Sequence, residues 1–199
     1  LTDSLAALMD EMQGEGVSAD AIETLDVSDA SGHWQRAQTF IRIAQDYLSR
    51  TTSEPDKENR QRQLVLALAA HWEANPPQQP IILAGSTGSR GTTLLLMEAI
   101  ATLPQGAIVL PGFDTDMPRS AWAHLNDAML SEDHPQYRFH KLLRSLSITR
   151  SDVMQWYETP PPSPARNALV SLSLRPAPVT DAWLAEGPKL PDLQEATRE

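Results

Sequence analysis

The sequence contains no cysteine, which excludes a disulfide framework, a thiolate metal site and a cysteine-held iron–sulfur cluster from these 199 residues. Long apolar runs are also missing: the longest, residues 64–70, is far shorter than the ~20 residues that a membrane helix needs. No basic segment precedes an apolar one at the start, so nothing marks export. These absences agree with a cytoplasmic protein. Because the chain opens at Leu1 inside a helical pattern, without an initiator methionine, we expect a fragment of a longer protein.

What is present is ordinary for a globular chain. The hydrophobic share is 41% and the charged share is 21%. The length is enough to bury a core and predicts one domain or little more. The net charge of -10 would repel nucleic acid as a whole, but the acidic excess is concentrated in the first 60 residues.

Helical patterns fill the first part of the chain. Apolar residues at helical spacing predict helices over residues 3–13, 18–25, 31–50 and 58–74, with Ser18 as a cap of the second. The third carries an apolar stripe made of Trp34, Ala37, Phe40, Ile41, Ala44 and Leu48. We therefore expect a helical subdomain over residues 1–77.

The pattern then changes to strands. The short apolar runs at residues 81–84 and 107–110 indicate buried parallel strands, and a helix is expected between them over residues 92–103. The fold class is thus α/β, with a core over residues 78–158. Further helices are expected over residues 118–130, 135–146 and 165–174, a capping box at Thr149 and Asp152, and a Pro-rich connector that opens a C-terminal extension over residues 159–199.

The turn after the first strand resembles two active-site motifs. A phosphate-binding P-loop that began at Gly85 would need Gly-Lys-Ser/Thr where Arg90, Gly91 and Thr92 stand, so the lysine is missing. Residues 84–88 also resemble the nucleophile elbow of a serine hydrolase, with Ser86 as nucleophile. The simpler interpretation is a tight turn that a Ser or Thr caps.

Partners for such a serine are easy to find in this sequence. The acids are Asp114 and Asp116, and the histidines are His124, His134 and His140. A hydrolase would also need a larger sheet and an oxyanion donor, which the sequence does not indicate. The same two acids could hold a cation, or they could simply form a solvated turn.

One segment is basic. Residues 134–151 contain no acid but carry Arg138, Lys141, Arg144 and Arg150. On a helix the first three fall on one side, opposite an apolar side made of Phe139, Leu142, Leu143 and Leu146. This ridge is either a solvated face or a DNA phosphate contact. The five tryptophans, Trp34, Trp72, Trp122, Trp156 and Trp183, are more typical of core or docking positions than of base-stacking platforms.

Several segments together resemble a known family. PPQQPIILAGSTGSRGTTLLLMEAIATLPQGAIVLPGFDTDM, then SAW at 120–122, DHPQY at 133–137 and RPAPVTDAW at 175–183, are similar to the AddB family in its alphaproteobacterial form. AddB proteins are double-strand break repair subunits of AddAB helicase-nucleases. The resemblance implies a longer parent, with a helicase-like N-terminal half and a nuclease domain whose cysteines hold an iron–sulfur cluster outside this fragment.

The same resemblance carries expectations about fold and function. It implies a RecA-like, superfamily 1 helicase-like core, in which Ala84, Gly85 and Ser86 stand where an active motor keeps its Walker B carboxylates. Without those carboxylates the fragment should turn over no ATP and hold no cofactor. The expected function is a non-catalytic scaffold in recombinational DNA repair, with DNA and the AddA subunit as partners.

Overall fold

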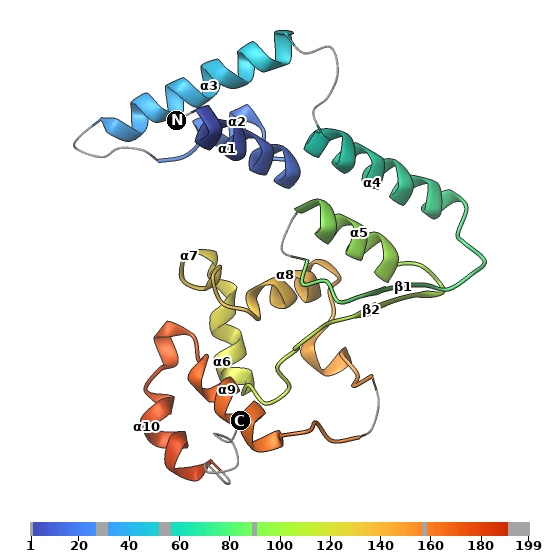
Figure 1. Ribbon diagram of the computed structural model, residues 1–199, viewed down its shortest axis with the longest axis vertical. Coiled ribbons are helices and arrows are strands. Elements are labelled where there is room, and N and C mark those ends of the chain that lie inside the picture. Colours follow the sequence, from blue (N-terminus) through green and yellow to red (C-terminus); the bar gives the residue numbers. More distant parts are fainter. Residues whose placement is uncertain (1, 27–31, 52–56, 89–90, 157–158, 191–199) are drawn as a thin grey trace. The chain divides into compact units, whose positions relative to one another are not determined.

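The computed structural model describes residues 2–26, 32–51, 57–88, 91–156 and 159–190 (Figure 1). The chain is mostly helical, with one small sheet, and it divides into two compact units. One unit comprises Leu1–Gln79 with Arg90–Gln105, and the other comprises Pro80–Ser89 with Gly106–Glu199. Within the described ranges, no helix is both long and apolar enough to cross a membrane.

The first unit consists of helices packed around methionines. Its elements are α1 (Thr2–Glu15), α2 (Ala19–Glu23), α3 (His33–Thr51), α4 (Lys57–Ala74) and α5 (Gly91–Ala101). The predicted helices are thus confirmed, as is the cap of α2, where the Ser18 hydroxyl accepts from the Ala21 N–H at 3.3 Å. Met9, Met12 and Ile22 are buried together, and α1 packs against α4 and α5.

The apolar stripe of α3 is less buried than its sequence predicts. Ile41 packs on the methionine core, but Phe40 is exposed and Trp34 leaves 59% of its surface accessible. The side chain of Leu48 lies outside the described part. The reason is length, since the main element packed on the 19 residues of α3 is the 5-residue α2, which is too short to cover the whole stripe.

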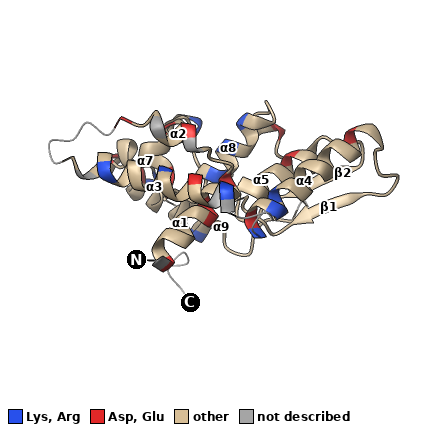
Figure 2. Cartoon of the chain, turned by 90° about the horizontal axis from the view of Figure 1, so that it is seen from above, with Lys and Arg blue, Asp and Glu red and all other residues tan. Residues whose placement is uncertain are grey.

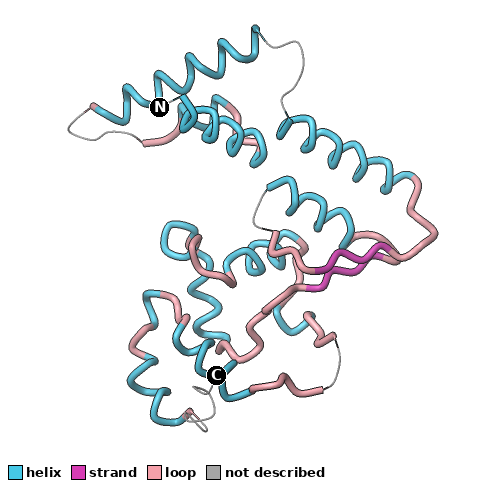
Figure 3. The backbone as a smooth tube through the Cα atoms, in the orientation of Figure 1, coloured by secondary structure: helices cyan, strands magenta, loops and turns pink. Residues whose placement is uncertain are grey.

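The second unit opens with the sheet, drawn in magenta in Figure 3. Strands β1 (Ile81–Ala84) and β2 (Gly106–Val109) pair in parallel, with Ile81 opposite Gly106 and Ala84 opposite Val109. The parallel pairing is confirmed, but the predicted burial is wrong. Alternate residues of β1 face solvent, Ile82 with 56% of its surface, and all of β2 is only half-buried. Apolar residues on both faces of these two strands therefore do not mean that other elements cover the sheet.

Short helices follow the sheet. They are α6 (Arg119–Ala123), α7 (Ala128–Ser131), α8 (Tyr137–Ser145), α9 (Pro164–Ser173) and α10 (Ala182–Glu186). The single helix expected over residues 118–130 is wrong, because a 3₁₀ turn at His124–Asn126 divides it and Asp127 starts α7 by accepting from the Met129 N–H at 2.9 Å. The capping box of Thr149 and Asp152 is confirmed and opens a 3₁₀ turn at Arg150–Asp152.

Gln136 links α8 to the loop that leaves β2. Its side-chain amide donates to the Gly112 carbonyl at 2.8 Å, and its side-chain oxygen accepts from the Asp114 N–H at 3.0 Å. Beside this link, the Phe113 ring lies 5.5 Å from that of Trp122 and 5.9 Å from that of Phe139. A buried polar side chain that satisfies backbone groups in this way fixes the start of α8 relative to the loop after β2.

Candidate nucleic-acid interface

Helix α8 separates its apolar and basic residues as its sequence predicts. Phe139, Leu142 and Leu143 are buried, whereas Lys141 and Arg144 are exposed. Arg138, Lys141 and Arg144 lie on α8, and Arg150 follows it in the 3₁₀ turn. Figure 2 shows Lys and Arg in blue and Asp and Glu in red along the whole chain. Residues three apart on a helix share a face. Lys141 and Arg144 therefore form an exposed basic face, named the α8 basic face below.

Arg138 is partly engaged by its neighbours. Its guanidinium lies 3.5 Å from the Glu132 carboxylate and 5.9 Å from the centre of the Tyr137 ring. The side chain of Arg138 keeps 25% of its surface accessible, against 61% for Glu132. An acid partner at this distance offsets part of the positive charge, so Arg138 contributes less to the α8 basic face than the sequence suggests.

Arg150 is held inside the second unit. One terminal nitrogen of its guanidinium donates to the Asp114 carbonyl at 2.6 Å, and the other donates to the Met117 carbonyl. The guanidinium carbon also lies 5.3 Å from the centre of the Trp122 ring, a cation–π distance. Two carbonyl bonds and an aromatic neighbour make Arg150 a brace between the 150–152 turn and the loop after β2.

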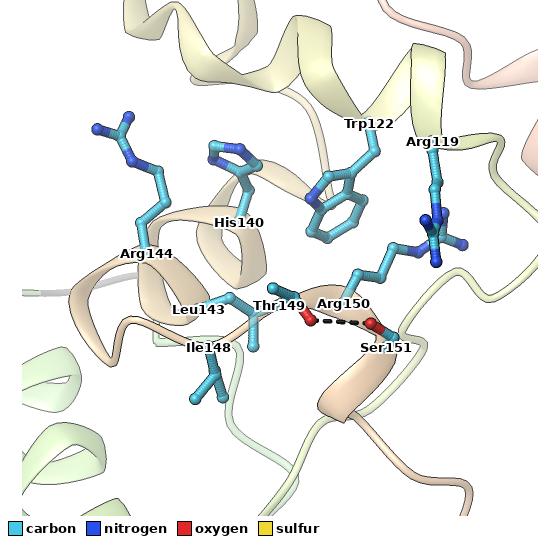
Figure 4. A pocket seen from close by; sticks show the side chains of 9 residues that line it. All are labelled: Arg119, Trp122, His140, Leu143, Arg144, Ile148, Thr149, Arg150 and Ser151. Atoms are coloured by element: carbon cyan, nitrogen blue, oxygen red, sulfur yellow. Dashed lines mark hydrogen bonds between the residues drawn. The ribbon is translucent and has the colours of Figure 1, made fainter.

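A pocket lies beside the α8 basic face (Figure 4). Its volume is about 380 Å³, and its lining comes from α6, α8 and the segment that follows α8. The lining residues are Arg119, Trp122, His140, Leu143, Arg144, Ile148, Thr149, Arg150 and Ser151. A smaller hollow of about 310 Å³ adjoins it on α8 and is lined in part by Lys141 and Tyr137. Sequence reasoning missed Arg119, because this arginine stands alone on a short helix.

His140 lines both hollows although only 6% of its surface is accessible. Its ring lies 5.6 Å from that of Trp122. Burial, and secondly the nearby charge of Arg144, lower the pKa of His140 below its ordinary value near 6.5. The imidazole is therefore neutral at pH 7, with one ring nitrogen as donor and the other as acceptor.

The glycine turn after β1 is a local turn in the second unit. Gly85 and Gly88 have positive φ, at 82° and 65°, and the Ser86 hydroxyl accepts from the Gly88 N–H at 3.2 Å. Ser86 thus stabilises the turn. Among the described hydrogen bonds, none joins Ser86 to an aspartate or a histidine. Arg90 lies outside the described residues.

In the first unit, a carboxylate of the protein itself binds the N-terminus of α5. A carboxylate oxygen of Glu15 accepts from the Gly91 N–H at 2.6 Å, and the Thr92 hydroxyl donates to the Gly14 carbonyl at 3.2 Å. A helix N-terminus attracts negative charge through its free N–H groups. Glu15, from α1, takes the place at Gly91 that a nucleotide phosphate would need.

Among the remaining candidates, the side chains of Asp114 and His134 have structural partners, whereas Asp116 and His124 are engaged through their backbone. Asp114 accepts from the N–H groups of Asp116 and Met117, both at 2.9 Å, so it forms a turn. His134 hydrogen-bonds to the Leu174 carbonyl at 2.5 Å and accepts from the Gln136 N–H at 3.0 Å. The carbonyl of His124 accepts from the Ser131 hydroxyl. Among the described residues, no three acids, histidines or cysteines are grouped to hold a metal ion.

Comparisons of the chain with models of protein families, with curated proteins and with solved structures find no match. Function is therefore inferred from this chain's own sequence and geometry.

Proposed function

We propose that this chain is a non-catalytic module of an AddB-family subunit and that it contacts the phosphate backbone of DNA through the α8 basic face. The observation that carries the proposal is that Lys141 and Arg144 stand exposed together in a segment without acids. Arg119, also exposed, adds a third cation at the adjoining pocket. Exposed Lys and Arg side chains supply most of the non-specific affinity of proteins for DNA.

The proposed contact is local and weak. The chain as a whole carries a net charge of -10, so the α8 basic face works against a repulsive overall field. Each phosphate contact releases condensed counterions, which makes such binding fall steeply with salt. We therefore expect DNA affinity that is measurable at low ionic strength and lost at high ionic strength.

The proposal assigns the chain a scaffold role without ATP turnover or a resident cofactor. Ala84, Gly85 and Ser86 offer no carboxylate at the end of β1, and the Gly91 N–H is bonded to Glu15. Both observations agree with a module that binds no ATP, and the RecA-like core is proposed from the family resemblance. The family resemblance adds AddA as the partner subunit and the cytoplasm as the location.

Charge reversal tests the DNA contact. The double variant Lys141→Glu/Arg144→Glu is expected to bind a fluorescein-labelled duplex at least tenfold more weakly in fluorescence anisotropy titrations at low salt. The matched control is Arg36→Glu/Lys57→Glu, which changes the net charge equally but on α3 and α4. If the two double variants lose affinity equally, the effect belongs to net charge and the α8 basic face is not the contact.

Co-purification tests the scaffold role. The chain, expressed with an AddA-type helicase-nuclease subunit, is expected to be retained with it on an affinity resin. No association at micromolar concentrations would leave the proposed partnership without support.

The two active-site interpretations have their own tests. Equilibrium dialysis with labelled ATP is expected to show no retained nucleotide, and a fluorophosphonate probe is expected to leave Ser86 unlabelled. Retained ATP, or labelling that Ser86→Ala abolishes, would replace the scaffold role with a nucleotide-binding or hydrolase function.

A further inference from the structure

The pocket beside α8 has the shape of a slot with apolar walls. In Figure 4 the rings of Trp122 and His140 stand on one side, and the side chains of Leu143 and Ile148 stand on the other. Its volume of about 380 Å³ falls within the range of ~300–1,000 Å³ typical of small-molecule pockets. Such walls suit a flat, largely apolar group, which they would contact on both faces.

Positive charge flanks the slot at both ends. Figure 4 shows the guanidinium group of Arg144 at one end and those of Arg119 and Arg150 at the other. Arg150 has its terminal nitrogens bonded to backbone carbonyls. Arg144 and Arg119 are exposed, and Arg144 donates only one terminal nitrogen, to the Asn126 side-chain oxygen at 3.1 Å, so its charge has no acidic partner in that bond. A ligand that fills the slot therefore has anionic groups on both sides of its flat part.

One wall of the slot also carries an unused polar group. The His140 side chain is mostly buried and its ring makes no hydrogen bond to any of the described residues, but neither ring nitrogen is fully buried, so both can still reach solvent or a ligand. The neutral imidazole faces the slot, where it can donate to or accept from the polar edge of a ligand.

We propose that this slot holds one unpaired nucleobase of a DNA strand, with the flanking phosphates contacted by Arg144 on one side and Arg119 on the other. The inference rests on the proposed DNA contact and adds the substrate form to it. A paired base cannot enter the slot, because its partner strand occupies its polar edge and stacking covers its faces. Base contacts with aromatic and apolar side chains depend little on base identity, so the site selects an unpaired base without reading sequence.

The test compares two strands that share phosphates and differ in bases. A labelled thymidine 15-mer and an abasic strand of the same length are titrated with the chain, and anisotropy gives both dissociation constants. The wild type is expected to bind the thymidine strand about tenfold more tightly, since one stacked base is worth about that factor. Equal affinity for the two strands overturns the base slot and leaves the phosphate contact standing. If neither strand binds and no duplex binds, the proposed function itself fails.

A variant that fills the pocket tests whether the preference for the thymidine strand arises at this slot. Ile148→Trp adds bulk at a position with 40% exposure and leaves every charge unchanged. It is expected to bind both strands with the affinity that the wild type has for the abasic strand. The control, Leu184→Trp, adds the same ring on α10 at a position with 86% exposure that does not line the pocket, and it should keep the tenfold preference. A preference that survives Ile148→Trp in a folded variant would put the base elsewhere and overturn the proposal.

Discussion

A carboxylate oxygen of Glu15 accepts a hydrogen bond from the Gly91 N–H at 2.6 Å, between residues 76 positions apart in the sequence. Glu15 is the last residue of α1, and Gly91 is the first of α5. The bond places a negative charge at the positive end of the α5 dipole. It joins two helices of the first unit at the point where a phosphate-binding protein would hold its ligand.

Removing that carboxylate should destabilise the first unit. Glu15→Ala is expected to lower the free energy of unfolding by about 1–2 kcal/mol, as for the loss of a helix cap, and Glu15→Gln by less because its amide oxygen can still accept. Urea unfolding followed by circular dichroism measures both. Glu11→Ala, at an exposed position on α1, is the control and should change little. A Glu15→Ala variant as stable as wild type would show that the bond contributes nothing.

Gly91 itself should tolerate no side chain. A Cβ atom there would lie 2.7 Å from a carboxylate oxygen of Glu15 and 2.9 Å from its Cα, and the latter cannot move away without shifting α1. Gly91→Ala is therefore expected to cost about 1–3 kcal/mol, the usual range for overpacking. Gly187→Ala is the matched control, since nothing lies within 4 Å of its added Cβ. Equal midpoints for the two variants in urea would contradict this packing.

Arg150 should contribute more to stability than Arg144, whose one side-chain hydrogen bond, to Asn126, is exposed. Arg150→Lys keeps the charge but loses the planar fork that reaches the carbonyls of Asp114 and Met117, so a loss of about 1–2 kcal/mol is expected. Arg144→Lys, on the exposed face, should stay within about 0.5 kcal/mol of wild type. Thermal or urea unfolding of the pair decides the matter. The brace is refuted if the two substitutions have the same effect.

Stability should fall in mild acid because of His140. Burial and Arg144 lower its folded-state pKa, whereas the unfolded chain takes up the proton near pH 6.5. The unfolded state therefore binds more protons, so the contribution of His140 is present above about pH 6.5 and is lost as the pH falls toward the lowered pKa. Urea unfolding at pH 7.5 and 5.5 should show a smaller loss for His140→Gln than for wild type. If wild type and His140→Gln lose the same unfolding free energy between these two pH values, the His140 imidazole is not held neutral by burial.

Local patterns predicted the helices well and their surroundings less well. The sequence located α1, α4, α8 and α9 to within a few residues. In α4 the apolar residues are not confined to one side and no residue is buried, so the pattern there gave the helix but not its packing. An apolar stripe also continues through residues 118–130, where Asp127 ends one element and caps the next. At this point the chain can either continue the helix or let the Asp127 side chain cap a new one. Which of the two forms depends on how the buried Leu125 packs, and the local sequence does not show that packing.

The candidate site was predictable only in part. The spacing of Lys141 and Arg144 located the α8 basic face, since it depends on one helix alone. In the sequence Arg150 looks like another basic residue of the same segment. Only the structure shows that its guanidinium donates to backbone carbonyls in the loop after β2 and is not available to DNA. The slot was missed because its walls come from three segments. The sequence also favoured core or docking roles for Trp122, and in the structure this residue both packs on the core and lines the slot.

The salt dependence of DNA binding tests the central claim most directly. Anisotropy titrations with a duplex at several salt concentrations between 50 and 200 mM give the slope of log Kobs against log[salt], which is about -0.9 per phosphate contact. If Lys141 and Arg144 each neutralise one phosphate, Lys141→Ala/Arg144→Ala should reduce the magnitude of this slope by about 1.8. A slope that is the same in the wild type and in this double variant would contradict a DNA contact through the α8 basic face.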